Sequence, residues 1–353
     1  MNTIALGEPT RETDVAHRKD DMNSFDYIIV GAGSAGCILA DKLSRNSKTS
    51  VLVLEAGGNN NSPWVSLPLG YGKLFNDSKR NWRFNTTPQK ALDDREDYWP
   101  RGKLVGGSGS INAMVYCRGL PNDFDDWHAA GATGWNWSEV QRQYDAIETN
   151  VAADGTKVGT GPIHLQDTSK QIHTVNRHFF KAMQELNLPV SDDCNGPEPE
   201  GATIYRINTK NGRRCSSADG FMKPALQRSN LELRINTPVR RIIVKQGRAI
   251  GVETGNGDVL HARAEVILSA GSVASPQILQ LSGIGPGKTL QRYGIPVLVD
   301  NPNVGGGLQD HLGINYYFEA TEPTLNNVLR PWYGKLRVGL QYLLTRKGPL
   351  SLS

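Results

Sequence analysis

The stretch Asp26-Tyr-Ile-Ile-Val-Gly-Ala-Gly-Ser-Ala-Gly36 decides the fold of this chain of 353 residues. Its first five residues are typical of a short buried strand, and a Gly-x-Gly-x-x-Gly pattern follows directly. The segment from Ala35 to Arg45 then predicts a helix, and Ser50-Val-Leu-Val-Leu-Glu55 predicts a second buried strand. Together these segments predict a βαβ unit of about thirty residues within an α/β fold.

The three glycines of this stretch predict a site for a dinucleotide. Gly31 allows the tight turn, Gly33 lets the backbone approach a pyrophosphate, and Gly36 lets the helix pack closely on the strand. The helix N-terminus adds partial positive charge, and Glu55, 24 residues after Gly31, suits the ribose hydroxyls and repels a ribose phosphate. A glycine-rich turn without a ligand is the alternative. The residues of this unit predicted to bind the cofactor are Gly31, Gly33, Ser34, Ala35, Gly36, Glu55 and Ala56.

The composition narrows the classes of partner. The chain has 39 basic and 35 acidic residues, a formal net charge of +4 and no block of like charge, which argues against binding to DNA or RNA. Four cysteines lie far apart in the sequence, which favours reduced structural thiols over a zinc site or a disulfide scaffold. No apolar run approaches the ~20 residues that cross a bilayer. We therefore expect a cytoplasmic protein, with peripheral attachment to the inner membrane left open.

The remaining chain predicts a mixture of helices and strands. The segment from Gly57 to Arg101 is irregular and indicates an extended covering segment. Helices are expected at residues 135–150 and 171–188. From Leu231 onward, short strands with glycine-containing turns predict a β-meander that feeds a last buried strand. The expected strands are residues 231–236, 239–244, 249–254, 258–262 and 266–270.

Two longer motifs resemble the signatures of the glucose-methanol-choline (GMC) oxidoreductases. The first is Arg101-Gly-Lys-Leu-Val-Gly-Gly-Ser-Gly-Ser-Ile-Asn-Ala-Met-Val115, and the second is Gly271-Ser-Val-Ala-Ser-Pro-Gln-Ile-Leu-Gln-Leu-Ser-Gly-Ile-Gly285. Two shorter pieces, Gly212-Arg-Arg-Cys-Ser-Ser-Ala218 and Val304-Gly-Gly-Gly-Leu-Gln-Asp-His311, also match. The four ordered motifs carry the resemblance from about Phe25 to beyond His311.

The resemblance implies a Rossmann-like FAD-binding domain with a β-meander, plus an incomplete α+β substrate domain. It divides the chain into a disordered leader (1–24), an FAD-binding domain (25–320, of which 151–210 contributes to the substrate domain) and the start of a truncated substrate domain (321–353). The sheet of a truncated substrate domain would expose an apolar face and an edge, and we expect an aggregation-prone or partly disordered region from about Gly313 onward. Independently of the family, the glycine-rich segment Gly106–Gly109 is typical of backbone laid against a flat ring, with Ile111, Met114 and Val115 buried behind it; a mobile surface loop is the alternative.

The resemblance also implies how the cofactor is held. Residues Gly106 to Val115 would line the flavin ring, Arg101 and Lys103 would lie near its phosphate end or in the covering segment, and the backbone of Val239 would contact the adenine. The residues carried over are Arg101, Val105, Gly106, Gly107, Ser108, Asn112, Ala113, Met114, Val115, Val239, Ala270 and Gly271. Asn112 stands where some members carry a flavin-linking histidine, so noncovalent FAD is expected. Gly109 and Gly307 stand where many members have serine and asparagine.

In this family an alcohol carbon gives hydride to flavin N5 while a histidine removes the hydroxyl proton. The family's base lies in a C-terminal His-x-x-Gly-Thr type segment that has no counterpart here, so we expect a truncated enzyme with no catalytic residue among its seven histidines. His311 belongs to a cofactor-proximal motif. No metal ligands are expected, because the acidic cluster Asp123, Asp125 and Asp126 favours helix capping and solvation.

The intact protein would act on a small-molecule alcohol and pass electrons to a quinone or oxygen. A non-enzymatic FAD-binding remnant or pseudoenzyme is the alternative function, and a lyase on the same scaffold is a third.

Overall fold

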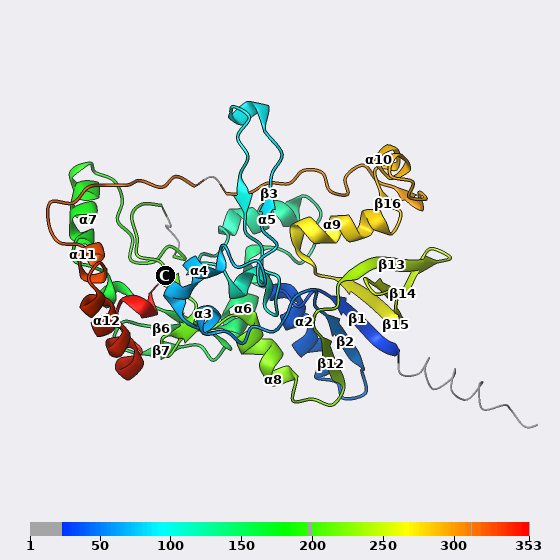
Figure 1. The fold of residues 1–353 in the computed structure, drawn as a ribbon, viewed down its shortest axis with the longest axis horizontal. Coiled ribbons are helices and arrows are strands. Elements are labelled where there is room, and N and C mark those ends of the chain that lie inside the picture. The colour runs from blue at the N-terminus through cyan, green and yellow to red at the C-terminus, as the bar shows by residue number, and fades with distance from the viewer. Residues whose placement is uncertain (1–22, 197–199, 312, 353) are drawn as a thin grey trace, which may run out of the picture. The chain divides into compact units, whose positions relative to one another are not determined.

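The computed structural model describes residues 23–196, 200–311 and 313–352. The chain forms two compact units, shown in Figure 1. The described part of unit 1 consists of residues 23–58 and Pro224–Asp310, and unit 2 of Asn59–Lys223 together with the residues after Asp310. The expected leader lies, up to residue 22, outside the described residues. The expected division into functional domains stays a prediction, because compact units are defined by packing and not by what they bind.

Unit 1 is built on a six-stranded mixed sheet (Figure 1). Its strand order is β12 (Leu231–Arg234), β2 (Val51–Leu54), β1 (Ser24–Val30), β15 (Val259–Leu268), β14 (Arg248–Thr254) and β13 (Val239–Lys245). The first four strands pair in parallel, and the last three pair antiparallel as the expected β-meander. Consecutive apolar residues occupy β1 and β2 because central parallel strands are buried on both faces.

The last strand of the meander differs from the expectation of two separate strands. β15 is one continuous strand: His261 and the residues before it pair antiparallel with β14, and the residues after it pair in parallel with β1. A register shift between Phe25 and Tyr27 of β1 accommodates this change of partner. The charged residues Arg263 and Glu265, which suggested a break, are exposed and alternate with less exposed neighbours.

The first expected strand of this region also lies elsewhere. β12 does not join the meander but pairs with β2 at the opposite edge of the sheet. Asn236 takes a left-handed conformation with φ of 53° and turns the chain. The following Thr237 donates its N–H to the Glu55 carbonyl at 2.8 Å, which carries the chain past the end of β2 before β13 begins.

The core of unit 1 lies between the sheet and its helices. α2 (Ser34–Ser44) contacts β1 and β2, and α9 (Gly271–Leu281) contacts β13. The unit also contains β16 (Ile284–Gly285), α10 (Gly287–Arg292) and β17 (Val299–Asp300). The largest fully buried side chains of the sheet are Ile28, Ile29, Leu52, Leu54 and Leu260.

Unit 2 contains a second sheet of five short strands. Its order is β5 (Val115–Tyr116), β9 (Arg206–Ile207), β8 (Ile163–Gln166), β6 (Glu148–Val151) and β7 (Lys157–Val158). The helices in this part of unit 2 are α5 (Pro121–Ala129), α6 (Trp137–Ile147) and α7 (Asn176–Glu185). α6 and α7 are both shorter than expected. α6 ends because Glu148 becomes extended and its carboxylate is buried against Tyr116 and Arg118, a tertiary contact that the helical pattern does not reveal.

The segment from Gly57 to Arg101, which follows β2, is less extended than expected. It forms α3 (Pro63–Ser66), a 3₁₀ turn at Pro68–Gly70 and α4 (Tyr71–Leu74), followed by a hairpin of β3 (Phe84–Asn85) and β4 (Tyr98–Trp99) whose tip projects from the unit (Figure 1). Prolines at the first helical positions start both turns. Val65 and Leu74 anchor these turns in a small core with Leu104 and Ile111.

The last described segment leaves an apolar surface. α11 (Leu325–Leu329) packs against α12 (Trp332–Thr345), and only Gly334, Val338 and Tyr342 of the α12 residues are buried. Tyr342 donates its hydroxyl to the Gly212 carbonyl at 2.9 Å. Large apolar side chains of α12 and of residues 314–318 are exposed, and the expected tendency of this region to aggregate stays a prediction. Within the described residues, no helix is long and apolar enough to cross a membrane.

Candidate functional site: a dinucleotide turn and a clamped glycine segment

The glycine-rich turn of unit 1 is shaped by close backbone contacts. Gly31 has φ of +98°, and a Cβ built on it would lie 2.7 Å from the Ser269 carbonyl oxygen. A Cβ on Gly36 would lie 2.0 Å from the Gly31 carbonyl oxygen, so only glycine allows α2 to pack this tightly on the end of β1. At Gly33 the nearest atom, the Ser269 oxygen, is 3.8 Å away. The turn therefore closes at Gly31 and Gly36 and leaves space at Gly33.

Glu55 connects this turn to the end of β2. Its carboxylate is buried, and it accepts one hydrogen bond from Ala32 N–H at 3.0 Å and another from Gly57 N–H at 2.8 Å. Glu55 thus holds the glycine turn and the chain after β2 together, and its contact with a ribose stays a prediction.

A second helix begins beside the first. Ser269 joins the ends of β15 and β1, because its N–H donates to the Val30 carbonyl at 2.9 Å and its hydroxyl donates to the Gly31 carbonyl at 2.9 Å. Ala270 is the N-cap of α9, and Gly271 has φ of +84° with no described atom within 4 Å of its Cβ position. The two helices α2 and α9 therefore start next to each other, at the carboxyl ends of adjacent parallel strands.

Both helix starts suit an anion. Neither N-cap, Gly33 or Ala270, supplies a side-chain cap from the described residues, and neither first turn contains an acidic residue. Ser34 and Ala35 are exposed at the start of α2. Backbone N–H groups at such a helix start are unpaired within the helix and carry partial positive charge. This edge of the sheet is the position at which α/β folds bind the phosphates of dinucleotides.

The other predicted cofactor residues of unit 1 surround this edge. Ala56 follows Glu55 directly and is half-buried. Val239 is the first residue of β13, paired with Thr254 and two positions after Thr237, which bonds the Glu55 carbonyl. The structure thus brings the start of β13 close to the end of β2, although three strands lie between them in the sheet.

In unit 2 the glycine-rich segment forms a single 3₁₀ turn, Gly107–Ser110, where the sequence predicted neither helix nor strand. Gly106 has φ of +90°, and a Cβ on it would lie 2.1 Å from the Ser110 hydroxyl, which donates to the Val105 carbonyl. Gly102 packs against Gly107 at a distance that excludes a Cβ. Ser108 is exposed and accepts a hydrogen bond from Gly102 N–H at 3.0 Å. The segment is an ordered turn and not a mobile surface loop.

Arg214 holds this turn in place. The sequence motifs did not reveal this role. Its buried guanidinium donates to the Val65 and Gly109 carbonyls at 3.0 and 3.1 Å. It also donates to the Asn112 side-chain oxygen and the Asn112 carbonyl, both at 2.7 Å. Burial lowers the pKa of Arg214 to about 10, a shift that Asp219 opposes, and the group stays charged at neutral pH. A buried arginine with four oxygen partners fixes the backbone of residues 109–112.

The residues after the turn only partly follow the predicted burial. Ile111 and Met114 are buried, but Val115 is exposed, because strand β5 begins there and turns alternate side chains to opposite faces. Met114 has φ of 61°, a conformation uncommon outside glycine, and its N–H donates to the Asn112 side chain at 3.1 Å. Asn112 therefore holds Arg214 and Met114 at once, while Ala113 between them is half-buried.

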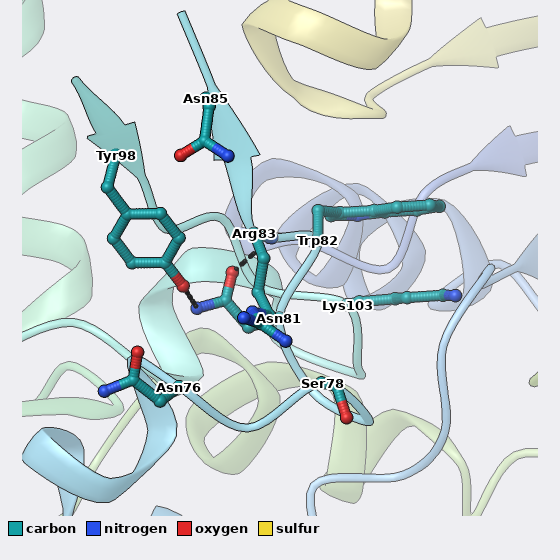
Figure 2. A pocket seen from close by; sticks show the side chains of 8 residues that line it. All are labelled: Asn76, Ser78, Asn81, Trp82, Arg83, Asn85, Tyr98 and Lys103. Atoms are coloured by element: carbon teal, nitrogen blue, oxygen red, sulfur yellow. Dashed lines mark hydrogen bonds between the residues drawn. The ribbon is translucent and has the colours of Figure 1, made fainter. Parts of the chain in front are cut away.

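A polar hollow of about 530 Å³ lies at the base of the β3–β4 hairpin (Figure 2). Its lining residues are Asn76, Ser78, Asn81, Trp82, Arg83, Asn85, Tyr98 and Lys103. The buried Asn81 organises it by accepting the Arg83 and Arg101 N–H groups at 2.9 and 3.0 Å. Lys103 lies over the Trp82 ring, 4.6 Å from its centroid. Both predicted covering-segment cations, Arg101 and Lys103, thus belong to one cluster of unit 2.

The acidic cluster of α5 caps helices, as predicted. Asp123 accepts the Leu120 N–H at 2.8 Å at the start of α5, and Asp125 accepts the Trp137 N–H at 2.9 Å at the start of α6. In the described part of the chain, no group of three or more His, Cys, Asp or Glu side chains is placed to hold a metal ion.

The histidines of unit 2 make structural contacts. The Nδ1 atom of His173 accepts the Val175 N–H at 3.2 Å, and His178 pairs with the exposed Glu322 at 2.8 Å. Burial, with Lys210 and Lys157 nearby, lowers the pKa of His164 in strand β8. None of these arrangements pairs a histidine with an oriented substrate site.

Named relatives share most of this chain. The oxygen-dependent choline dehydrogenases of Vibrio vulnificus and of Sinorhizobium fredii are each 40% identical to it over 329 residues, which is 92% of this chain and 59% of the relative. The chain therefore spans about three fifths of the length of the curated relatives that it matches.

Solved structures agree with the fold. A pyridoxine 4-oxidase from Mesorbium loti is similar with a TM-score of 0.74 and 33% identity, over 79% of this chain and 56% of that chain. An FAD-dependent oxidoreductase from Chaetomium thermophilum gives a TM-score of 0.82 at 26% identity, over 93% of this chain and 60% of that chain. A formate oxidase gives 0.80 at 26% identity, over 94% and 60%.

The sequence profile described as GMC oxidoreductase matches residues 25–313. This interval contains the glycine turn, the clamped segment of unit 2 and the start of α9, which are the features that the resemblance singled out. The chain therefore belongs to the GMC oxidoreductase family, whose α/β FAD-binding fold and FAD cofactor the sequence motifs predicted.

Proposed function

We propose that this chain binds FAD noncovalently and forms the cofactor-binding part of an oxidoreductase acting on the CH–OH group of a small-molecule alcohol. The observation that carries the proposal is the edge of unit 1 where α2 and α9 begin side by side at Gly33 and Ala270. Two uncapped helix starts without acidic residues match the two negative charges of a pyrophosphate. The buried Glu55 carboxylate beside them matches ribose hydroxyls and disfavours an additional phosphate on the ribose.

For unit 2 we propose that the turn held by Arg214 lies against the flavin ring. A buried charged group that fixes Gly109 and Asn112 is a means of presenting backbone at a constant position, which a flat rigid ligand requires. The residues assigned to this contact are Val105, Gly106, Gly107, Ser108, Asn112, Ala113, Met114 and Val115. Asn112 cannot form a covalent link to flavin, which supports noncovalent attachment.

The chemistry follows from the cofactor class. Held by the glycine turn of unit 1 and the segment Gly106–Val115, a flavin would supply the hydride acceptor for the alcohol carbon, and the residues around it would orient the alcohol. We assign no proton acceptor among the histidines of this chain and propose oxygen as the electron acceptor, with a quinone as the alternative. Support comes from the relatives named oxygen-dependent choline dehydrogenases, which suggest an amino alcohol or a related small alcohol as the substrate.

Gly33 offers a direct test of FAD binding. Its φ of −71° and ψ of −167° suit a capping side chain, and its Cβ position is open, so Gly33→Asp should fold at least as well as the original chain. The added carboxylate would occupy the N–H groups of α2 and repel phosphate. We expect the original chain to show a visible flavin spectrum and Gly33→Asp to bind FAD at least about tenfold more weakly, since one charge at a helix start contributes about 1 to 2 kcal/mol.

Gly33→Asn is the matched control, because it caps the helix without the charge and should weaken FAD binding less than Gly33→Asp does. FAD should leave the protein on acid denaturation if it is noncovalent. Equal FAD affinity in the original chain and Gly33→Asp would contradict the proposal. Alcohol oxidation with an artificial electron acceptor is a separate assay: flavin binding without turnover favours the non-enzymatic alternative, and turnover contradicts the absence of a base.

A further inference from the structure

Two cysteines that are 77 positions apart in the chain lie side by side in unit 2. The Sγ atoms of Cys117 and Cys194 are 3.9 Å apart. Cys117 follows strand β5 and is exposed, whereas Cys194 lies half-buried in the loop formed by residues 191–196. The other two cysteines are different: Cys37 and Cys215 are buried, and their thiols donate to the Ala32 and Pro162 carbonyls. All four cysteines are free thiols, and Cys117 and Cys194 are close in space although they are far apart in the sequence.

The backbone around the pair is held in place. Asn195 accepts the Arg118 N–H at 2.6 Å with its side-chain oxygen and donates its side-chain NH₂ to the Tyr116 carbonyl at 3.1 Å. Asn195, the residue after Cys194, thus forms hydrogen bonds with the residues on both sides of Cys117. Because both contacts are made by one side chain, the backbone itself keeps the two thiols in register.

The two segments that Asn195 connects make further contacts of their own. On one side, Tyr116 and Arg118 both bond the buried carboxylate of Glu148, at 2.8 and 3.0 Å. On the other, Asp193 accepts the Asn195 N–H at 2.9 Å and lies 3.6 Å from the Arg206 guanidinium. The thiol pair therefore joins two segments that have little freedom to separate.

We propose that Cys117 and Cys194 form a reversible disulfide, with hydrogen peroxide as the oxidant. A disulfide needs its sulfur atoms at about 2.05 Å, and rotation of the two side chains closes the remaining gap. This inference does not depend on the function proposed above.

The exposure of the two thiols assigns their order of reaction. The Cys117 thiolate attacks peroxide, so that an S–O bond forms, the O–O bond breaks, and water leaves after proton transfer. Cys194 then attacks the Cys117 sulfur as its own proton departs; the S–S bond forms, the S–O bond breaks, and a second water leaves. The two thiols lose two electrons and two protons, and peroxide is reduced to two waters. Burial and the neighbouring Cys117 raise the pKa of Cys194 to about 11, which suits it to the second step and not the first.

The bond would close a long loop of unit 2. Residues 117–194 contain α5, α6, α7 and strands β6 to β8, so the cross-link removes much of the freedom of the unfolded chain. We expect the oxidised form to unfold at a temperature about 5 °C or more above the reduced form.

The test uses the complete chain, reduced, freed of reductant and treated with equimolar hydrogen peroxide. After alkylation and non-reducing digestion, mass spectrometry should find one peptide pair linking Cys117 to Cys194, with Cys37 and Cys215 as thiols. Dithiothreitol should restore all four thiols. The proposal is wrong if Cys117 instead becomes a sulfinic acid, or links two chains, while Cys194 stays reduced.

Variants separate the two roles. In Cys194→Ser, Cys117 should stop at a sulfenic acid that dimedone traps, and in Cys117→Ser, Cys194 should stay reduced at the same peroxide level. Identical oxidation products of Cys117 in Cys194→Ser and the original chain would overturn the second step. Asn195→Ala should slow disulfide closure about tenfold or more without changing the rate of sulfenic acid formation, and exposed Asn256→Ala should change neither. An unchanged closure rate in Asn195→Ala would overturn the positioning role of Asn195.

Discussion

The sheet of unit 1 is rich in valine, isoleucine and leucine and helix α12 of unit 2 is rich in leucine, yet their environments differ. Leu52 and Leu54 of β2 are 0% and 1% exposed, whereas Leu343 and Leu344 of α12 are 62% and 83% exposed. The sheet has neighbours on both faces, and α12 is covered on one side only. Apolar sequence thus predicts where a surface can be buried, and the partner that buries it has to be found in the fold.

Replacement of Gly36 should have the largest effect, a loss of stability in the sheet of unit 1. In Gly36→Val the new Cβ would meet the Gly31 carbonyl oxygen at 2.0 Å, so helix or strand must move. We expect the local stability of β1 and α2 to fall by about 4 kcal/mol or more. Hydrogen exchange measured by mass spectrometry on peptides of residues 24–44 reports this loss. Gly33→Ala, placed in open space, is the control, and equal protection in both variants would show that the contact is not rigid.

A cavity in the sheet should have the next largest effect. Leu52→Ala removes a fully buried side chain of β2 and should lower the stability of the sheet by about 3 kcal/mol, because the neighbours relax only partly into the space. Faster exchange should appear in β1, β2 and β15 together, since these strands share the core. If only β2 peptides exchange faster, the sheet does not open as one cooperative unit.

An ion-pair network at the edge of the same sheet should contribute less. Asp26 accepts Ser50 N–H at 2.7 Å and the Arg263 guanidinium at 2.9 Å, and this pairing with Arg263 lowers its pKa below the ordinary 3.8. Because the folded-state pKa is the lower one, the stabilisation is present above about pH 4 and is lost as the pH falls through that folded pKa.

Asp26→Asn should therefore lower stability by about 1 kcal/mol at pH 7, a figure already reduced for partial exposure, and should flatten the loss of stability below pH 4. Urea denaturation of both proteins at pH 7 and pH 3 measures the difference. Asp258→Asn, in an exposed turn, is the control. If Asp26→Asn and the original chain lose the same stability between pH 7 and pH 3, Asp26 is not the cause of that loss.

The smallest change in stability is expected on α12. Leu344→Lys should alter the stability of unit 2 by no more than about 0.5 kcal/mol, because the side chain is already in solvent. Self-association measured by sedimentation should decrease at the same time, since an exposed apolar surface is made smaller. Val338→Ala, at a buried position of the same helix, should be more destabilising; the reverse order would mean that Leu344 is covered in solution.

The sequence predicts local features of the fold well and distant ones poorly. The β1 strand, its glycine turn and α2 are encoded by neighbouring residues, and so is the β13–β14 pairing. β12 was expected beside β13 because the two are adjacent in the chain, but no local signal shows that its partner is β2. The continuity of β15 was likewise hidden by charged residues that turn out to face solvent.

The same limit applies to the candidate site. Gly31, Gly36 and Glu55 could be selected from spacing, because a turn and the end of the next strand are fixed by the βαβ unit. Arg214 could not, because its partners Val65 and Asn112 are 149 and 102 positions away. The closeness of Cys117 and Cys194 was hidden for the same reason. The position of Arg214 in the family motif Gly212–Ala218 is the sequence signal that could have drawn attention to it.

The position of β15 also bears on how the polypeptide is made. β1 is synthesised well before its parallel neighbour β15, which ends at Leu268, after residues 59–223 of unit 2 have been made. Until then the nascent β1 has an unpaired edge on that side and can pair only with β2. Closure of the sheet across so many residues is a slow, long-range step, so the unpaired edge of β1 must be kept from pairing with other polypeptides during that interval. On this topology, the newly made N-terminal strand is the natural point at which a chaperone would be needed.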